Sequence, residues 1–140
     1  VQGGELFMLG YKPYVMSVGQ IGKIKFNENA KRLVHLGAIP EFNHNEMEAA
    51  LGSSESAVVV VIASDSYSER KLHRLSVTGA NFTRRCAHVH TLQLPGFSML
   101  ADTLYGVWLL DFASLFVAKA QGTDPMSIDA IEGFKLELNA

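Results

Sequence analysis

The sequence predicts an α/β protein in which helices cover both faces of a parallel β-sheet. Residues 57–63 form an uninterrupted run of β-branched and other apolar residues, which indicates a strand buried on both faces. Segments with strand character also alternate with segments of helical character along the chain. With 140 residues and 48% hydrophobic content, the chain is predicted to form a single α/β sandwich domain.

The first predicted strand and helix follow from short apolar patterns. Residues 13–19 are predicted to form a buried strand that ends at a glycine. Asn27 is predicted to cap a helix that runs toward Leu36, where Gly37 and Pro40 close it.

Two further helices are predicted on either side of the central strand. Asn43 or Asn45 is expected to cap a short helix that ends at Gly52. The turn at 64–66 is expected to open a longer helix that stops at Gly79. The apolar positions of this longer helix are Leu72, Leu75 and Val77.

The last part of the chain is predicted to hold one strand and two helices. Residues 88–94 alternate between apolar and polar and are followed by Pro95-Gly96, so we expect a strand that ends there. A long apolar helix is predicted through residues 100–115, and a terminal helix at 128–138.

Composition excludes several classes of function. The 12 basic residues are scattered among 14 acidic ones and the net charge is -2, which argues against a nucleic-acid surface. The lone Cys86 has no partner for an internal disulfide, which favours a reducing, cytoplasmic compartment. The apolar stretch at 97–120 contains Asp102 and Asp111, so a buried helix is favoured over a membrane span. The first residues carry no leader pattern, so neither secretion nor organelle import is expected.

Two segments, 26–31 and 40–46, are unusually rich in Asn, Glu and His. Both are predicted to be helix starts, where backbone N–H groups and side-chain amides face a ligand. In the first turn, the helix dipole would hold Glu28 ionised, as a proton-abstracting base requires. The alternative is that Asn27 and Asn43 are ordinary caps and Glu28 is a surface acid that matches the dipole.

Other candidate groups give weaker signals. Imidazole exchanges its proton near neutral pH, so His44 is a candidate general acid or base, although it shares no helix face with Glu28 and a single histidine is more often structural. His88 and His90 could point the same way from a strand, but without an acidic or cysteine partner no metal site is predicted. The turn at 64–66 could contact phosphate, yet Asp65 repels anions, so helix capping is favoured. No dinucleotide loop or P-loop is present, and no cofactor is predicted.

Three motifs, taken in order, carry a family resemblance. They are residues 27–31 (Asn-Glu-Asn-Ala-Lys), residues 43–46 (Asn-His-Asn-Glu) and residues 122–125 (Gly-Thr-Asp-Pro), followed by a closing helix that contains Lys135. Together they resemble the bifunctional phosphoglucose/phosphomannose isomerases, over nearly all of the C-terminal half of that family. The resemblance implies a three-layer, flavodoxin-like sugar-isomerase (SIS) domain.

The resemblance also implies roles for individual residues. Glu28 would be the base that moves a proton between C1 and C2 of the sugar through a cis-enediol(ate). His44 would assist ring opening in the active site of the neighbouring subunit, and Lys135 would approach the ring oxygen or hydroxyls, unless it only offsets a helix dipole. The residues expected to bind substrate are Asn27, Asn29, Lys31, Asn43 and Asn45.

The same resemblance implies partners. The family works as a dimer in carbohydrate metabolism, in glycolysis and gluconeogenesis. Each subunit has an N-terminal SIS half whose Ser/Thr-rich turns hold the substrate phosphate, and residues 1–140 contain no equivalent of that half. The isolated chain is therefore expected to be weakly active or inactive, because positioning supplies much of the rate. The alternative function is a non-catalytic module for dimerisation and sugar-phosphate sensing.

Overall fold

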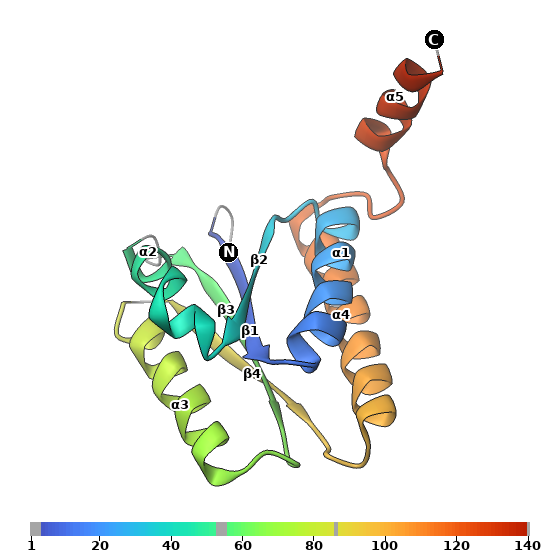
Figure 1. The fold of residues 1–140 in the computed structure, drawn as a ribbon. Coiled ribbons are helices and arrows are strands. Elements are labelled where there is room, and N and C mark those ends of the chain that lie inside the picture. The colour runs from blue at the N-terminus through green and yellow to red at the C-terminus, as the bar shows by residue number, and fades with distance from the viewer. Residues whose placement is uncertain (1–3, 53–55, 86, 140) are drawn as a thin grey trace.

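A computed structural model describes residues 4–52, 56–85 and 87–139, in which parallel strands form one sheet between two layers of helices (Figure 1). The strand order is β2-β1-β3-β4, and every pair is parallel. The α/β prediction is confirmed. The strands are β1 (Leu6–Tyr11), β2 (Val34–Ile39), β3 (Val58–Ser64) and β4 (His88–Leu94).

Helices lie on both faces of the sheet. The first layer consists of α1 (Gln20–Asn29) and α4 (Met99–Gln121), and the second of α2 (Glu46–Gly52) and α3 (Glu69–Thr83). A short π-helix, η1 (Val15–Gly19), leads into α1, and a 3₁₀ turn, η2 (Glu41–His44), precedes α2. The last helix, α5 (Asp129–Leu138), extends away from both layers (Figure 1).

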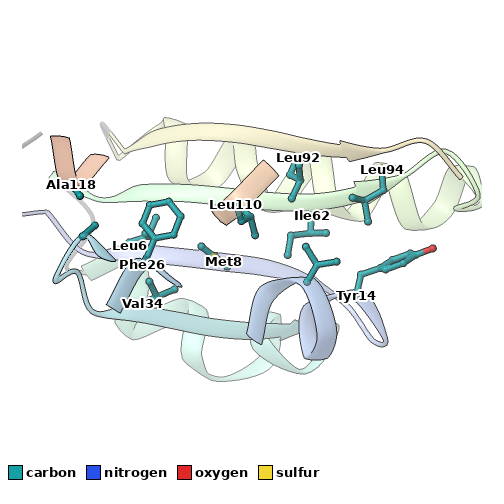
Figure 2. Packing of buried hydrophobic residues seen from close by; sticks show 12 residues of the cluster. Leu6, Met8, Tyr14, Phe26, Val34, Ile62, Leu92, Leu94, Leu110 and Ala118 are labelled. Carbon is teal, nitrogen blue, oxygen red and sulfur yellow. The ribbon is translucent and has the colours of Figure 1, made fainter. Parts of the chain in front are cut away.

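Each face of the sheet has its own hydrophobic core. Figure 2 shows the core under α1 and α4, where side chains from all four strands meet Phe26 and Leu110. On the other face, Phe42 and Phe82 are almost fully buried between the sheet and the second helical layer. The sheet is therefore covered on both sides, as the apolar run in β3 predicts.

Two glycines allow α4 to pack closely against the α1 layer. A Cβ atom at Gly22 would lie 2.5 Å from Cδ1 of Leu110, and one at Gly106 would lie 2.7 Å from Cγ1 of Val18. Real carbon atoms do not approach this closely, so larger residues would push the helices apart. This packing fixes the first turn of α1 relative to α4.

The strand predicted at 13–19 is wrong. The chain is helical from Tyr14 onward, and the first strand is β1, earlier in the sequence. Val15 and Val18 are fully buried whereas Met16 is 56% exposed. Apolar residues spaced three apart share a helix face, whereas strand residues share a face at a spacing of two.

The helix predicted from Asn27 to Leu36 is also wrong. Asn27 lies in the last turn of α1, and β2 begins at Val34. Gly37 does not stop a helix. It lies within β2, where an added Cβ would come within 2.6 Å of the side chains of Leu9 and Phe42.

The remaining elements agree with the prediction. The strands at 58–64 and 88–94 are present, as are the short helix ending at Gly52, the long apolar helix and the terminal helix. The helix after β3 begins later than predicted, after Ser68, and it continues past Gly79 because that residue packs against Val89 of β4. Cys86 lies outside the described residues.

Candidate functional site

A buried polar cluster lies at the carboxyl ends of β1 and β3. Asp102, in the first turn of α4, is fully buried. Its carboxylate accepts hydrogen bonds from the Tyr14 hydroxyl at 2.7 Å, the Ser64 hydroxyl at 3.1 Å and the Gly96 N–H at 3.0 Å. This carboxylate therefore joins the segments that follow three strands of the sheet.

The cluster lies where an α/β sheet commonly binds ligands. The strand order changes direction between β1 and β3, and the crevice outside the carboxyl ends at such a point is a frequent ligand site. Here the Asp102 carboxylate already engages the Tyr14 and Ser64 hydroxyls and the Gly96 N–H. Ser64 therefore contacts an internal carboxylate and does not cap α3, whose N-cap residue is Ser68.

Burial and the neighbouring carboxylate act together on Tyr14. Burial raises the pKa of its hydroxyl and Asp102 raises it further, while hydrogen bonding with Ser64 and Ser66 lowers it. The net pKa is above the ordinary value, so Tyr14 keeps its proton and remains a donor to Asp102. Burial also raises the pKa of Tyr67, whose buried hydroxyl has no hydrogen-bond partner among the described residues.

Glu28 lies at the opposite, amino end of the sheet. It is exposed in the last turn of α1, not in the first turn as expected. The C-terminal end of a helix carries partial negative charge, so the dipole does not hold this carboxylate ionised. Among the described residues, no hydrogen bond or ion pair engages the Glu28 carboxylate.

His44 is far from Glu28 within one chain. It is the exposed last residue of η2, just after the carboxyl end of β2, whereas Glu28 precedes the amino end of the same strand. At about 3.3 Å per residue, β2 separates the two ends by roughly 17 Å. One chain therefore cannot place both side chains on one sugar carbon.

Lys135 lies on α5, which extends from the same end of the molecule as Glu28 (Figure 1). The ammonium group is exposed and lies 2.9 Å from the Glu132 carboxylate one turn earlier. This contact is an exposed pair of the kind that contributes little to stability. Lys135 is therefore available to a ligand that approaches α5.

Most of the predicted substrate-binding amides make contacts within the chain. Asn29 donates to the Ser114 hydroxyl at 2.7 Å and so links α1 to α4. Asn43 donates to the Thr78 hydroxyl at 3.1 Å. The Asn45 oxygen accepts the N–H of Glu46, the first residue of α2, and its amide donates to the Glu41 carboxylate at 3.0 Å.

Asn27 and Lys31 are the other two predicted substrate-binding residues. The side-chain oxygen of Asn27, like that of Asn43, is buried without a hydrogen-bond partner among the described residues. The Lys31 ammonium donates to the backbone oxygens of Glu28 at 2.6 Å, Asp124 at 3.2 Å and Ser127. Lys31 therefore holds parts of its own chain together.

Neither the pair His88 and His90 nor the pocket between the ends of α1 and α4 provides a site for a sugar phosphate. His88 and His90 are exposed on β4, and in the described part of the chain no group of three or more metal-ligand side chains gathers. A pocket of about 230 Å³ opens between the ends of α1 and α4, but apart from Arg32 and Gln121 its lining is apolar. The Arg32 guanidinium already binds the Gly4 carbonyl.

The family of bacterial phospho-glucose isomerase C-terminal SIS domains matches residues 2–138. This chain belongs to that family. Among the curated relatives, the bifunctional phosphoglucose/phosphomannose isomerase of Thermoplasma acidophilum is 29% identical over 134 residues, covering 93% of this chain and 41% of that protein. The enzyme of the same name from Aquifex aeolicus is 30% identical over 141 aligned residues, covering 92% of this chain and 43% of that protein.

The SIS-domain fold is also found in a solved structure. A glucose-6-phosphate isomerase-like protein from Thermus thermophilus matches with a TM-score of 0.65 and 18% identity, over 87% of this chain and 42% of that one. At this identity, the match supports the fold alone. The chain spans about two fifths of the length of the curated relatives.

Sequence reasoning misses the Asp102 cluster of this SIS domain. In the sequence, Asp102 serves only as an argument against a membrane-spanning helix, and Tyr14 is predicted to lie in a strand. A carboxylate in an otherwise apolar helix is itself a signal, because a buried charge requires partners. Those partners come from distant segments, which sequence spacing does not reveal.

Tyr14 and Tyr67 provide a matched test of the cluster. Tyr14→Phe removes a hydrogen bond to a buried carboxylate and is expected to lower the free energy of unfolding by about 1.5–3 kcal/mol. Tyr67→Phe removes a buried hydroxyl without a partner in the described residues, so the free energy of unfolding is expected to stay the same or to rise by up to about 2 kcal/mol. Urea unfolding followed by circular dichroism measures both. Equal losses in the two variants would contradict the proposed importance of the Tyr14–Asp102 bond.

Proposed function

We propose that this SIS domain is the C-terminal half of an isomerase that interconverts glucose 6-phosphate or mannose 6-phosphate with fructose 6-phosphate. Family membership supports the reaction class, and the two curated relatives are named phosphoglucose/phosphomannose isomerases. The observation that carries the proposal is the exposed Glu28 carboxylate, which has no bonding partner among the described residues.

Aldose–ketose isomerisation requires a base that removes a proton beside a carbonyl and returns it to the neighbouring carbon. One carboxylate can perform both transfers through a cis-enediol(ate), so we assign this role to Glu28. A base that is not engaged elsewhere can approach the substrate, and positioned bases contribute roughly 10²–10⁴-fold to the rate. Lys135, which lies at the same end of the molecule, is proposed to contact the ring oxygen or hydroxyls.

We propose that the active site is shared between two subunits. Glu28 and His44 lie at opposite ends of β2 and cannot meet within one chain. A second copy can bring its own His44 to the Glu28 of the first, and His44 would then assist ring opening. Asn27 remains a candidate for substrate binding, because its buried oxygen has no partner among the described residues.

The substrate phosphate is proposed to bind to an N-terminal half. The relatives are more than twice the matched length, and at the switch point of this domain the Asp102 carboxylate occupies the donors. A second anion there would meet an existing negative charge. We therefore place the phosphate outside residues 1–140, and we place the assembled enzyme in the cytoplasm.

The outer face of α4 supports the proposed homodimer. Every fourth residue from Asp102 to Ala118 is buried against the domain, and the opposite side exposes a series of large apolar residues. By length and hydropathy, α4 is also the one described helix that could cross a membrane. The exposed residues are Met99, Leu100, Leu104, Tyr105, Trp108, Leu109, Phe112, Leu115 and Phe116.

The size of this face fits a stable dimer. Side chains of this kind bury on the order of 100 Å² each, so the face offers roughly 1,000 Å², above the roughly 800 Å² per partner of a standard interface. Obligate homodimer interfaces are more apolar than interfaces between domains of one chain. We therefore assign the α4 face to a second copy of this chain.

Glu28→Gln is expected to lower turnover at least about a hundredfold in the assembled isomerase, because the amide cannot accept the substrate proton. The side chain is exposed, so the circular dichroism spectrum and unfolding midpoint should not change. Glu48→Gln, an exposed carboxylate on α2, is the matched control and should retain full turnover. Near-normal turnover in Glu28→Gln would remove this residue from the role of base.

Isomerase activity is expected only when both halves are present. The purified chain incubated with fructose 6-phosphate should form little glucose 6-phosphate, and adding the N-terminal half of a relative should restore the reaction. A coupled assay for glucose 6-phosphate follows both arrangements. Binding of fructose 6-phosphate without turnover in either arrangement would instead support the sensing and dimerisation module.

The chain is expected to sediment as a dimer, and the double variant Trp108→Asp/Phe112→Asp as a monomer, because the new charges face the apolar surface of the partner. Val77→Asp, at a 46% exposed position on α3, is the control and should leave the dimer intact. Sedimentation equilibrium measures the mass. A wild-type monomer that binds the N-terminal half would assign the α4 face to that half instead.

A further inference from the structure

The Lys31 side chain crosses from the end of α1 to the segment before α5. Its ammonium group donates to the Glu28 carbonyl at 2.6 Å, in the last turn of α1. It also donates to the carbonyls of Asp124 at 3.2 Å and of Ser127. An ammonium group has three protons to donate, so these three acceptors use its full capacity.

The backbone at Lys31 is unusual for a lysine. Its φ is 53°, in the left-handed region, and Lys31 is the one described non-glycine residue with positive φ. It follows Ala30, the C-cap of α1, at the position where most helices that end this way place glycine. A non-glycine residue in this conformation is strained and persists where the surroundings hold it.

The segment that Lys31 binds has few other links to the domain. None of the described residues of α5 is buried, and Phe134 is 60% exposed. Figure 1 shows α5 extending past the ends of α1 and α4. In the described chain, every hydrogen bond between residues 124–138 and the part of the domain before residue 118 is donated by the Lys31 ammonium.

We propose that Lys31 is a positioning residue that ties the α5 segment to the end of the helix that carries Glu28. The tether sets where α5 begins and so where Lys135 stands relative to the Glu28 carboxylate. This inference rests on the proposed function for its catalytic consequence, but the tether itself is a property of this chain. It also replaces the expectation that Lys31 binds the substrate, because the ammonium group is already saturated.

The first measurement tests the tether without any activity. Backbone ¹⁵N relaxation of the 140-residue chain is expected to show a rigid α5, with order parameters of about 0.85. In Lys31→Gly, glycine suits the left-handed backbone and keeps the fold stable, but the tether is lost. The order parameters of residues 129–138 should then fall below about 0.6.

Two further variants separate the ammonium group from the backbone effect. Lys31→Met keeps the length of the stem without a donor and should loosen α5 as Lys31→Gly does. Lys31→Arg keeps several donors and should restore much of the rigidity. Lys23→Met, which removes a lysine from α1 that has no bonded partner among the described residues, is the matched control and should leave α5 unchanged. A rigid α5 in Lys31→Gly would overturn the proposal.

The second measurement tests the consequence for catalysis. In the enzyme assembled with an N-terminal half, Lys31→Gly is expected to lower kcat about tenfold to a hundredfold, since misplacing a group by about 1 Å can cost a hundredfold. KM should change little, because the phosphate is held elsewhere. A loosened α5 with unchanged kcat would overturn the positioning role. An inactive wild-type assembly would refute the proposed isomerase, while the relaxation data would still decide whether the tether exists.

Discussion

The parallel direction of the strands is the constraint on which the rest of this domain depends. Each strand runs the same way, so each connecting helix returns the chain to the starting edge. Residues that follow strands gather at one end of the sheet, and residues that end helices gather at the other. His44 belongs to the first group and Glu28 to the second. No local adjustment brings them together, so a site that uses both must be assembled from more than one chain.

The two ends of the sheet are consequently specialised in different ways. At the carboxyl end, where such sheets often bind a ligand, the Asp102 carboxylate accepts hydrogen bonds from segments at the ends of β1, β3 and β4. These three donors therefore stabilise the fold and are not available to bind a ligand. At the amino end, Glu28 and Lys135 are exposed, and no comparable network occupies them in the described chain. Two of the three groups proposed to act on the substrate, Glu28 and Lys135, therefore lie at the end that such sheets less often use, while His44 lies at the other.

Much of the fold can be predicted from patterns in the sequence, and each wrong prediction has a local cause. β3 and β4 are predicted correctly because β-branched runs and strict alternation are strong signals. β1 is missed because its sequence, Leu-Phe-Met-Leu-Gly-Tyr, lacks β-branched residues and contains a glycine. β2 is predicted as a helix because the residue after the C-cap of α1 is Lys31, and not the glycine or asparagine that usually marks a helix end.

The candidate site shows the same limit of sequence reasoning. The motifs identify the family, but they do not reveal which end of a helix each motif occupies. No sequence pattern marks a lysine whose backbone adopts the left-handed conformation. The hydrogen bonds from Asn29 to Ser114 and from Tyr14 to Asp102 join residues far apart in the chain. Such contacts arise only when the layers pack. For this reason the cluster around Asp102 and the structural use of the asparagines could not be anticipated.

Glu28 lies in the last turn of its helix and not in the first turn as predicted. The helix dipole therefore acts on its carboxylate with the opposite sign. At a helix start, the dipole would have stabilised the charged carboxylate, whereas at a helix end the free carbonyls repel it. Lys31 offsets this repulsion, because its ammonium group binds the carbonyl of Glu28 itself. A base must take up and release a proton in turn, and the Glu28 carboxylate has no bonding partner in the described chain that would hold it away from a substrate. The same lysine that orders α5 thus makes a helix end a tolerable place for the proposed base.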